Sequence, residues 1–127
     1  MGYRSDVQGL IYGAEDEVTA LLVAAKLRGL PDALMEHVKE VTFMSGDEEY
    51  HGLHLQWNYV KWYDDYPEIQ AWYWLRDKAE ERGLAYEFVR IGEELEDMER
   101  DERGDTIDVL YVPRSVHMAY DLVVKEG

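Results

Sequence analysis

The chain has 127 residues, and 13 Lys or Arg against 28 Asp or Glu give a formal net charge of −15 at pH 7. With 46% hydrophobic and 13% aromatic residues it can fill a core, which excludes wholesale disorder. The chain has no cysteine, so disulfides, thiolate zinc sites and thiol catalysis are also excluded. We therefore expect residues 1–127 to form a single acidic domain that is stabilised by packing.

The sequence also restricts where the protein acts. The opening MGYRSDVQGL lacks the basic and then apolar pattern of a signal peptide, and no apolar run reaches the roughly 18 residues of a membrane span. We expect a cytoplasmic protein. Because the strong negative charge repels nucleic acid and anionic lipid, we expect neither direct nucleic-acid binding nor membrane binding.

The first half of the chain predicts two strands and two helices. Alternation over residues 7–11 predicts a strand, and apolar residues at helical spacing from Val18 to Ala25 predict a helix that stops at Gly29. The break at Leu30-Pro31-Asp32 starts a second short helix lined by Leu34, Met35 and Val38. The β-branched and aromatic residues 41–44 predict the next strand.

The second half begins with the clearest strand, over residues 53–63. There Leu53, Leu55, Trp57 and Tyr59 alternate with polar residues, which predicts one buried and one wet face. A helix follows from Pro67 to Gly83, and further strand candidates cover 84–91, 107–112 and 116–124, the last with a helix as alternative.

This order of elements predicts an α+β fold, a ferredoxin-like sandwich with a mainly antiparallel sheet and helices packed on one face. The polar strand positions are expected on the other face of the sheet or near its edge. The stretch from Glu93 to Asp108 holds nine acids and two arginines, for a net charge of −7. It is interpreted as a solvated loop, with one helical turn around Leu95, Met98 and Glu99.

Candidate catalytic and metal-binding residues have simpler interpretations. His51 and His54 are three residues apart on a predicted strand, so they point to opposite faces and do not form a metal site. Asp64 and Asp65 precede a helix, where carboxylates cap exposed amides. The sequence contains no nucleophile elbow, phosphate-binding loop or dinucleotide fingerprint. We therefore predict no catalytic residue, no metal ligand and no cofactor.

Two alternatives remain open. In a small-ligand or nucleotide-binding module, His54, Gln56, Asn58 and the neighbouring aromatic residues would line a pocket. In a metal-assisted hydrolase, His54 would act with Asp64 or Asp65.

Aromatic residues are densest between Trp57 and Trp74, where eight large rings lie within eighteen residues. One strand face and one helix stripe cannot bury them all, and exposed aromatic residues are typical of interfaces. On a helical wheel of residues 67–83, Trp74 falls among charged residues, so we expect a covering segment of the chain, a second copy or a partner to meet it. The expected partner-binding residues in this region are Trp62, Tyr63, Asp64, Asp65, Tyr66 and Trp74.

The acidic stretch supplies a second candidate surface. Carboxylates along a rigid surface can imitate the phosphates of a nucleic acid and occupy a basic groove. On this interpretation the binding residues are Glu96, Asp97, Asp101 and Glu102.

Four blocks, in the order MGYRSDV, VKWYDDYPEIQAW, FVRIGEELEDMERDERGD and YVPRSV, resemble a family of small acidic proteins encoded by bacteriophages and prophages. The resemblance implies a product made in the cytoplasm of an infected bacterium, and it supplies no catalytic residues. Small phage accessory proteins commonly bind and obstruct a host protein. We therefore expect a non-enzymatic protein that binds a host or phage macromolecule, with a basic protein as the favoured partner.

Overall fold

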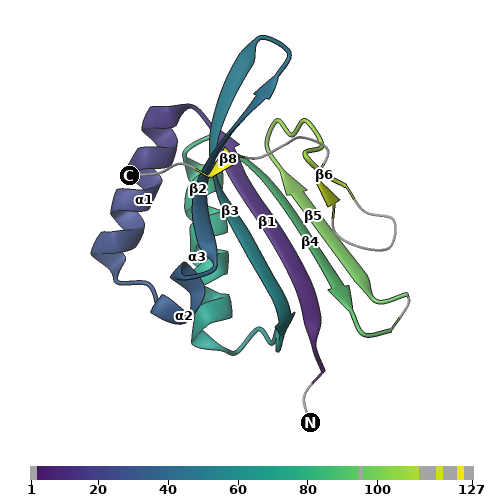
Figure 1. The fold of residues 1–127 in the computed structure, drawn as a ribbon. Helices are drawn as coiled ribbons and strands as arrows, with labels where there is room; N and C mark the ends of the chain where they lie inside the picture. The colour runs from purple at the N-terminus through teal and green to yellow at the C-terminus, as the bar shows by residue number, and fades with distance from the viewer. Residues whose placement is uncertain (1–2, 95, 112–116, 119–122, 125–127) are drawn as a thin grey trace.

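The computed structural model describes residues 3–94, 96–111, 117–118 and 123–124. Three helices pack against one face of an antiparallel sheet (Figure 1). The helices are α1 (Glu15–Arg28), α2 (Asp32–Met35) and α3 (Pro67–Glu81). The strands are β1 (Ser5–Gly13), β2 (Val38–Ser45), β3 (Glu48–Val60), β4 (Ala85–Gly92), β5 (Met98–Arg103), β6 (Leu110–Tyr111), β7 (His117–Met118) and β8 (Val123–Val124).

The strands of the main sheet have the order β5-β4-β1-β3-β2-β8, and every neighbouring pair is antiparallel. The predicted α+β class and antiparallel sheet are therefore confirmed. Strand β1 is central, since Gly9 pairs with Leu55 of β3 on one side and with Phe88 of β4 on the other. Alternation along β1 directs Val7 and Ile11 toward the helices, and Leu10 and Tyr12 toward the opposite face.

The core under the helices depends on close contact between α3 and β1. The ring of Trp72 is fully buried directly over Gly9, and a Cβ atom at position 9 would lie 2.3 Å from Trp72 Cζ2. The Trp72 indole N–H donates a 2.9 Å hydrogen bond to the buried Tyr86 hydroxyl. Only glycine allows the ring to approach the strand this closely.

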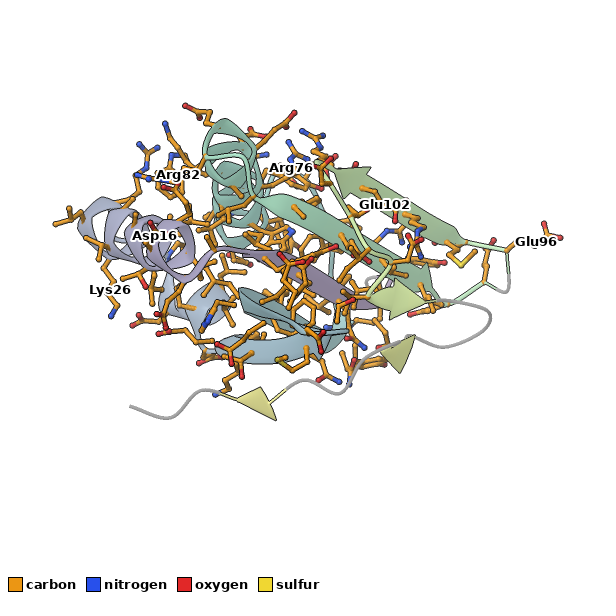
Figure 2. The ribbon with its side chains drawn as sticks, turned by 90° about the horizontal axis from the view of Figure 1, so that it is seen from above. Asp16, Lys26, Arg76, Arg82, Glu96 and Glu102 are labelled. Carbon is orange, nitrogen blue, oxygen red and sulfur yellow. The ribbon has the colours of Figure 1, made fainter. Side chains whose placement is uncertain are left out.

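The opposite face of the sheet has a core of its own, so the expectation that it carries the polar positions was incomplete. Gln8, His54 and Gln56 do lie along it, but one end is covered by the segment that leads into β6, as Figure 2 shows from above. The buried residues of this second core are Leu10, Tyr12, Val41, Phe43, Ala85, Val89, Val109 and Leu110.

A buried carboxylate fastens that covering segment. Glu87 of β4 is fully buried and accepts hydrogen bonds from the Tyr12 hydroxyl at 2.5 Å, the Val109 amide at 3.0 Å and the Leu110 amide at 2.9 Å. The amide of Ile107 donates to the Tyr12 oxygen at 2.7 Å. Burial, and then the contact with Glu87, raises the pKa of Tyr12. These bonds offset the cost of burying the polar groups on both sides.

Three sequence predictions are corrected. The acidic stretch is not a loop with a helical turn, because Met98–Arg103 forms edge strand β5 and pairs with β4. Val38 starts strand β2 instead of lining a second helix, since α2 ends at Met35. Strand β3 ends at Val60, so Tyr63 lies in the connection to α3.

The predicted strands over 107–112 and 116–124 are described only at β6, β7 and β8, and the rest of 112–127 lies outside the described residues.

The alternation in β3 also stops earlier than predicted. Ser5 pairs with Val60 while Val7 pairs with Trp57, so β3 has one more residue than β1 over this interval. Tyr59 sits at this bulge with a left-handed φ of 57°, and it is 71% exposed instead of facing the core. Its amide donates to Asp6 Oδ1 at 2.8 Å. Beyond the bulge, the even-numbered Val60 and Trp62 enter the core under the helices.

Among the described residues, no helix has both the length and the apolar character required to cross a membrane.

The contact between Trp72 and Gly9 can be tested with a double-mutant cycle. Gly9→Ala should lower the free energy of unfolding by about 1–3 kcal/mol, the usual cost of overpacking a core. The cost should be smaller in a Trp72→Phe background, because phenylalanine lacks the benzo-ring atoms nearest to position 9. Urea denaturation of the four proteins measures both values, and equal costs in the two backgrounds would show that the contact is not the cause.

Candidate functional site

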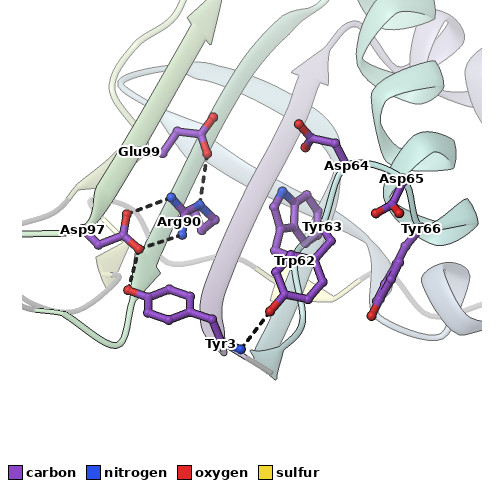
Figure 3. Close-up of a pocket in the computed structure, with 9 residues that line it drawn as sticks. All are labelled: Tyr3, Trp62, Tyr63, Asp64, Asp65, Tyr66, Arg90, Asp97 and Glu99. Carbon is purple, nitrogen blue, oxygen red and sulfur yellow. Dashed lines mark hydrogen bonds and ion pairs between the residues drawn. The ribbon is translucent and has the colours of Figure 1, made fainter. Parts of the chain in front are cut away.

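A groove of about 860 Å³ opens where the β3–α3 connection faces the β4–β5 hairpin (Figure 3). Six of its lining residues are ones that the sequence predicts as partner-binding, namely Trp62, Tyr63, Asp64, Asp65, Tyr66 and Asp97. Tyr3, Arg90 and Glu99 complete the lining. The structure thus brings the aromatic candidates together with one member of the acidic set.

The wall on the hairpin side is organised by Arg90. Its guanidinium donates to Asp97 Oδ1 at 2.9 Å and Oδ2 at 3.2 Å, and its Nε donates to Glu99 Oε1 at 3.0 Å. A further bond of 3.1 Å reaches Ser5 Oγ on β1. The hydrogen bond from Arg90 is the main reason that the pKa of Asp97 is lowered, followed by the one from Tyr3. Four of the five N–H groups of Arg90 are therefore engaged by its own chain.

The N-terminal segment is tied across this wall by Tyr3. The Tyr3 hydroxyl donates to Asp97 Oδ2 at 2.5 Å and accepts from the Glu94 amide at 3.0 Å. The Tyr3 amide donates to the Tyr63 hydroxyl on the facing wall at 2.8 Å. The hydrogen bond to Asp97 is the main cause of the raised pKa of Tyr3. Tyr3 thus links the two walls of the groove.

The wall on the α3 side is aromatic and acidic. Trp62 is only 8% exposed, and its ring lies 5.4 Å from that of Phe88 and 6.4 Å from that of Tyr73, measured between centroids. Tyr63 and Tyr66 are partly buried, and their rings meet nearly at right angles. These rings therefore have fixed orientations.

The sequence predicted that Asp64 and Asp65 cap the start of α3, but their side chains do not do so. The N-cap residue is Tyr66, with no side-chain cap. Asp64 Oδ1 instead accepts a 2.7 Å hydrogen bond from the Tyr73 hydroxyl. Burial, and then Asp64, raises the pKa of Tyr73 to about 12, while the nearby Trp62 lowers it. Within the described part of the chain, the Asp65 carboxylate makes no hydrogen bond or ion pair, so it is free to meet a ligand.

The remaining predicted residues lie elsewhere. Trp74 is partly buried in a second pocket of about 440 Å³ beside residues 28–31, with the Arg28 guanidinium 5.4 Å from its ring centroid, so a segment of the chain covers part of it. Glu96 projects from the β4–β5 hairpin (Figure 2). Asp101 and Glu102 are adjacent on β5 and face opposite sides of the sheet. The four acids proposed to imitate phosphates therefore do not share one face.

The residues of the metal-assisted hydrolase are not brought together either, whereas His54 and Gln56 of the small-ligand alternative lie on the same face of β3. His54 faces away from the helices and contacts Gln8 at 2.8 Å, whereas Asp64 binds Tyr73 on the helix side. Burial lowers the pKa of His54 to about 4. His51 is on the other face of β3, beside Glu49 and Glu15 at 3.0 and 3.5 Å. The two histidines therefore point apart, as their spacing predicts.

One other carboxylate cluster has metal-ligand types at suitable separations. Ligand oxygens of Glu87, Glu102 and Asp108 lie within 4.8 Å of one another. However, Arg100 already contacts Glu102 at 2.9 Å and Asp108 at 3.5 Å, and Glu87 accepts three hydrogen bonds. Contact with Glu102 is the main cause of the raised pKa of Asp108. Arg100 thus supplies the positive charge that a cation would bring.

Sequence reasoning missed three groove residues: Tyr3, Arg90 and Glu99. The available signal was the single arginine within the apolar run FVRIG, because a charged residue in a strand that packs under helices requires an acidic partner. The pairing of Arg90 with Glu99 follows from β5, which the sequence analysis treated as a loop.

Two neighbouring acids should respond oppositely to the same loss of charge. Glu96→Gln should leave stability unchanged or raise it by less than about 0.5 kcal/mol, because the exposed Glu96 has no described partner and adds only repulsion. Asp97→Asn should lower stability by about 1 kcal/mol, because it weakens the bonds to Arg90 and Tyr3. Chemical denaturation tests this difference, and a loss of stability in both variants would contradict it.

His54 should make stability depend on pH. Its folded pKa of about 4 lies below the ordinary histidine pKa of 6.5, so the unfolded chain binds a proton first as the pH falls. The contribution is fully present above pH 6.5 and is lost between pH 6.5 and 4, by up to about 3 kcal/mol at 1.36 kcal/mol per pKa unit. Unfolding measured at pH 7 and pH 5 should show a larger decrease for wild type than for His54→Gln. Equal decreases would exclude His54 as the source.

Comparison of the chain with protein-family models, with curated proteins and with solved structures gave no match.

Proposed function

We propose that this protein is a non-enzymatic phage accessory protein that binds a basic host or phage protein in the cytoplasm of an infected bacterium. The observation that carries the proposal is the groove, in which aromatic rings and carboxylates from separate parts of the chain line one surface. Interfaces are typically anchored by such half-buried aromatic residues, with charged groups that select and orient the partner. The resemblance to phage-encoded proteins supplies the biological setting.

The net charge of −15 supports a basic partner. Around the groove, Asp64, Asp65, Asp97 and Glu99 carry four negative charges against the one positive charge of Arg90. This excess attracts a cationic surface and speeds its diffusional encounter, an effect that salt weakens. The same field repels nucleic acid, so we propose no direct binding to DNA or RNA.

Imitation of a nucleic acid by the acidic stretch has weaker support. Arg90, Arg100 and Arg103 form ion pairs with acids of this stretch, including Asp97, Asp101 and Glu102. These arginines neutralise charge where the imitation would require it. We therefore place the binding surface at the groove.

We also propose a ferredoxin-like sandwich as the finer description of the fold. Support comes from the order β4-β1-β3-β2 within the sheet, and from the helices in the β1–β2 and β3–β4 connections. Two split βαβ units would produce this arrangement. The additional strand β5 extends the sheet beyond α3 and forms one wall of the groove.

The proposed function is tested by capture of partners from bacterial lysate with the purified, tagged protein. At about 0.05 M salt the bait should retain a basic protein that about 0.5 M salt releases, because the Debye length falls about threefold over this range. An unrelated acidic protein of similar size and charge is the control bait. The purified partner should then bind the bait directly and with the same salt dependence. Retention of nothing beyond what the control bait retains would refute the proposal.

A further inference from the structure

One part of the groove has the chemistry of a cation site, formed by the rings of Tyr63 and Tyr66 and the carboxylate of Asp65; we call it the aromatic corner. We propose that the aromatic corner receives the guanidinium group of an arginine side chain from a protein partner. This inference rests on the proposed function and specifies the group that is recognised.

The geometry of the two rings suits a planar cation. Their centroids lie 5.4 Å apart and their planes meet at 89°, so one ring can stack on a guanidinium while the other closes its edge. Both side chains are partly buried, and Tyr66 packs on the core under the helices. The Tyr63 oxygen also accepts the 2.8 Å bond from the Tyr3 amide. Little ordering is therefore needed when a ligand binds.

The charges beside the rings favour a cation. Asp97 and Glu99 are paired with Arg90, and Asp64 is held by Tyr73, whereas Asp65 has no described partner. Figure 3 shows Asp65 beside Tyr66, on the wall that faces Arg90. A guanidinium stacked on Tyr66 can donate an N–H to this carboxylate, which is a charge-assisted hydrogen bond. An anionic ligand would meet carboxylates there and find the charge of Arg90 already paired with Asp97 and Glu99.

The protein itself uses this pairing at other aromatic side chains. Arginines lie over three of them, Arg4 over Tyr59 at 5.0 Å, Arg28 over Trp74 at 5.4 Å and Arg76 over Tyr73 at 4.6 Å from the ring centroid. Among the described residues, no cation lies over Tyr63 or Tyr66. The aromatic corner therefore offers the aromatic faces of such a site without the arginine that covers them.

Arginine fits the aromatic corner better than lysine. A guanidinium is planar, stacks on aromatic faces and is more weakly hydrated than an ammonium group, so it loses less solvation on entering a partly buried site. Its several N–H groups can also reach the Asp65 carboxylate while the plane stays on the ring. The ammonium group of lysine is a compact charge without a planar surface that could stack on a ring.

The test uses the full chain and a nine-residue peptide, (Gly-Gly-Arg)3, with its citrulline counterpart as the neutral isostere. We expect the arginine peptide to shift the NMR signals of Tyr63, Asp65 and Tyr66, and the citrulline peptide to bind at least about tenfold more weakly, because its charge is lost. A lysine peptide should bind about threefold more weakly than the arginine peptide. Equal binding of the arginine and citrulline peptides would overturn the inference.

Matched variants locate the site. Asp65→Asn should weaken arginine-peptide binding about fivefold, whereas Asp47→Asn, the same change at an exposed turn residue, should alter it less than about twofold. Tyr66→Leu should weaken binding about threefold, whereas Tyr59→Leu should leave it within about twofold. Melting temperatures confirm that each variant is folded. If Asp47→Asn and Asp65→Asn weaken binding equally, the effect is one of net charge, and the inference fails.

The same variants separate this inference from the proposed function. If the lysate yields a partner that wild type and Asp65→Asn bind with equal affinity, the protein binds a partner without the aromatic corner, and only the inference is overturned. If no specific partner is captured while the arginine peptide still depends on Asp65 and Tyr66, the cation site stands and the proposed function falls. Loss of partner binding in Asp65→Asn, but not in Asp47→Asn, supports both.

Discussion

Strand β1 pairs along its length with β3 on one side and β4 on the other, and this double pairing determines where most other residues lie. Side chains alternate along a strand, so the register of β1 assigns Val7, Gly9 and Ile11 to the helix side and Leu10 and Tyr12 to the other face. A shift by one residue would exchange the two faces. Glycine would then face the second core, and a bulky side chain would meet Trp72.

The groove results from a second constraint, the burial of a positive charge. Arg90 occupies a position in β4 whose neighbours along the same face, Phe88 and Tyr86, are buried under the helices. A partly buried guanidinium needs acidic partners, and Asp97 and Glu99 of the hairpin provide them. The ion pairs of Arg90 with Asp97 and Glu99 therefore hold the hairpin against β4, and the hydrogen bond from Tyr3 to Asp97 holds the N-terminal segment beside it. The groove is the space that remains between this assembly and the β3–α3 connection.

The sequence allowed the α+β class and most elements to be predicted, because α1 and α3 have clear stop signals and β1 and β3 alternate over several residues. Trp62–Tyr66, which the sequence groups as partner-binding residues, line one groove, since neighbours in the chain remain neighbours in space. Strand β5 was missed because every residue of MERDER after Met98 is charged, which is common at a sheet edge and carries no hydrophobic period. The three remaining groove residues depended on that strand or on long-range contacts, which local patterns do not encode.

The second core was unpredictable for a related reason. Glu87 looks like a surface residue in a strand, and only its contact with amides more than twenty residues later makes its burial favourable. Periodicity describes which residues face the same way, but it does not reveal which distant segment supplies the missing hydrogen-bond donors. For the same reason, the eight rings between Trp57 and Trp74 could be counted but not assigned to core and surface one by one.

The bulge at Tyr59 gives the chain a sensitivity to length that ordinary substitutions do not reveal. Since β3 contains one more residue than β1 over the interval that ends at Val60, the side chains after the bulge are in the opposite phase to those before it. Trp62 reaches the core because the bulge absorbs this extra residue. A deletion of one residue between Trp57 and Val60 would remove the bulge and restore regular alternation, with Val60 and Trp62 still on the helix side, whereas an inserted residue that the bulge did not absorb would turn Trp62 toward the opposite face. At this place the number of residues matters more than their identity, so among related chains substitutions and the loss of one residue should be tolerated, and insertions should be rare.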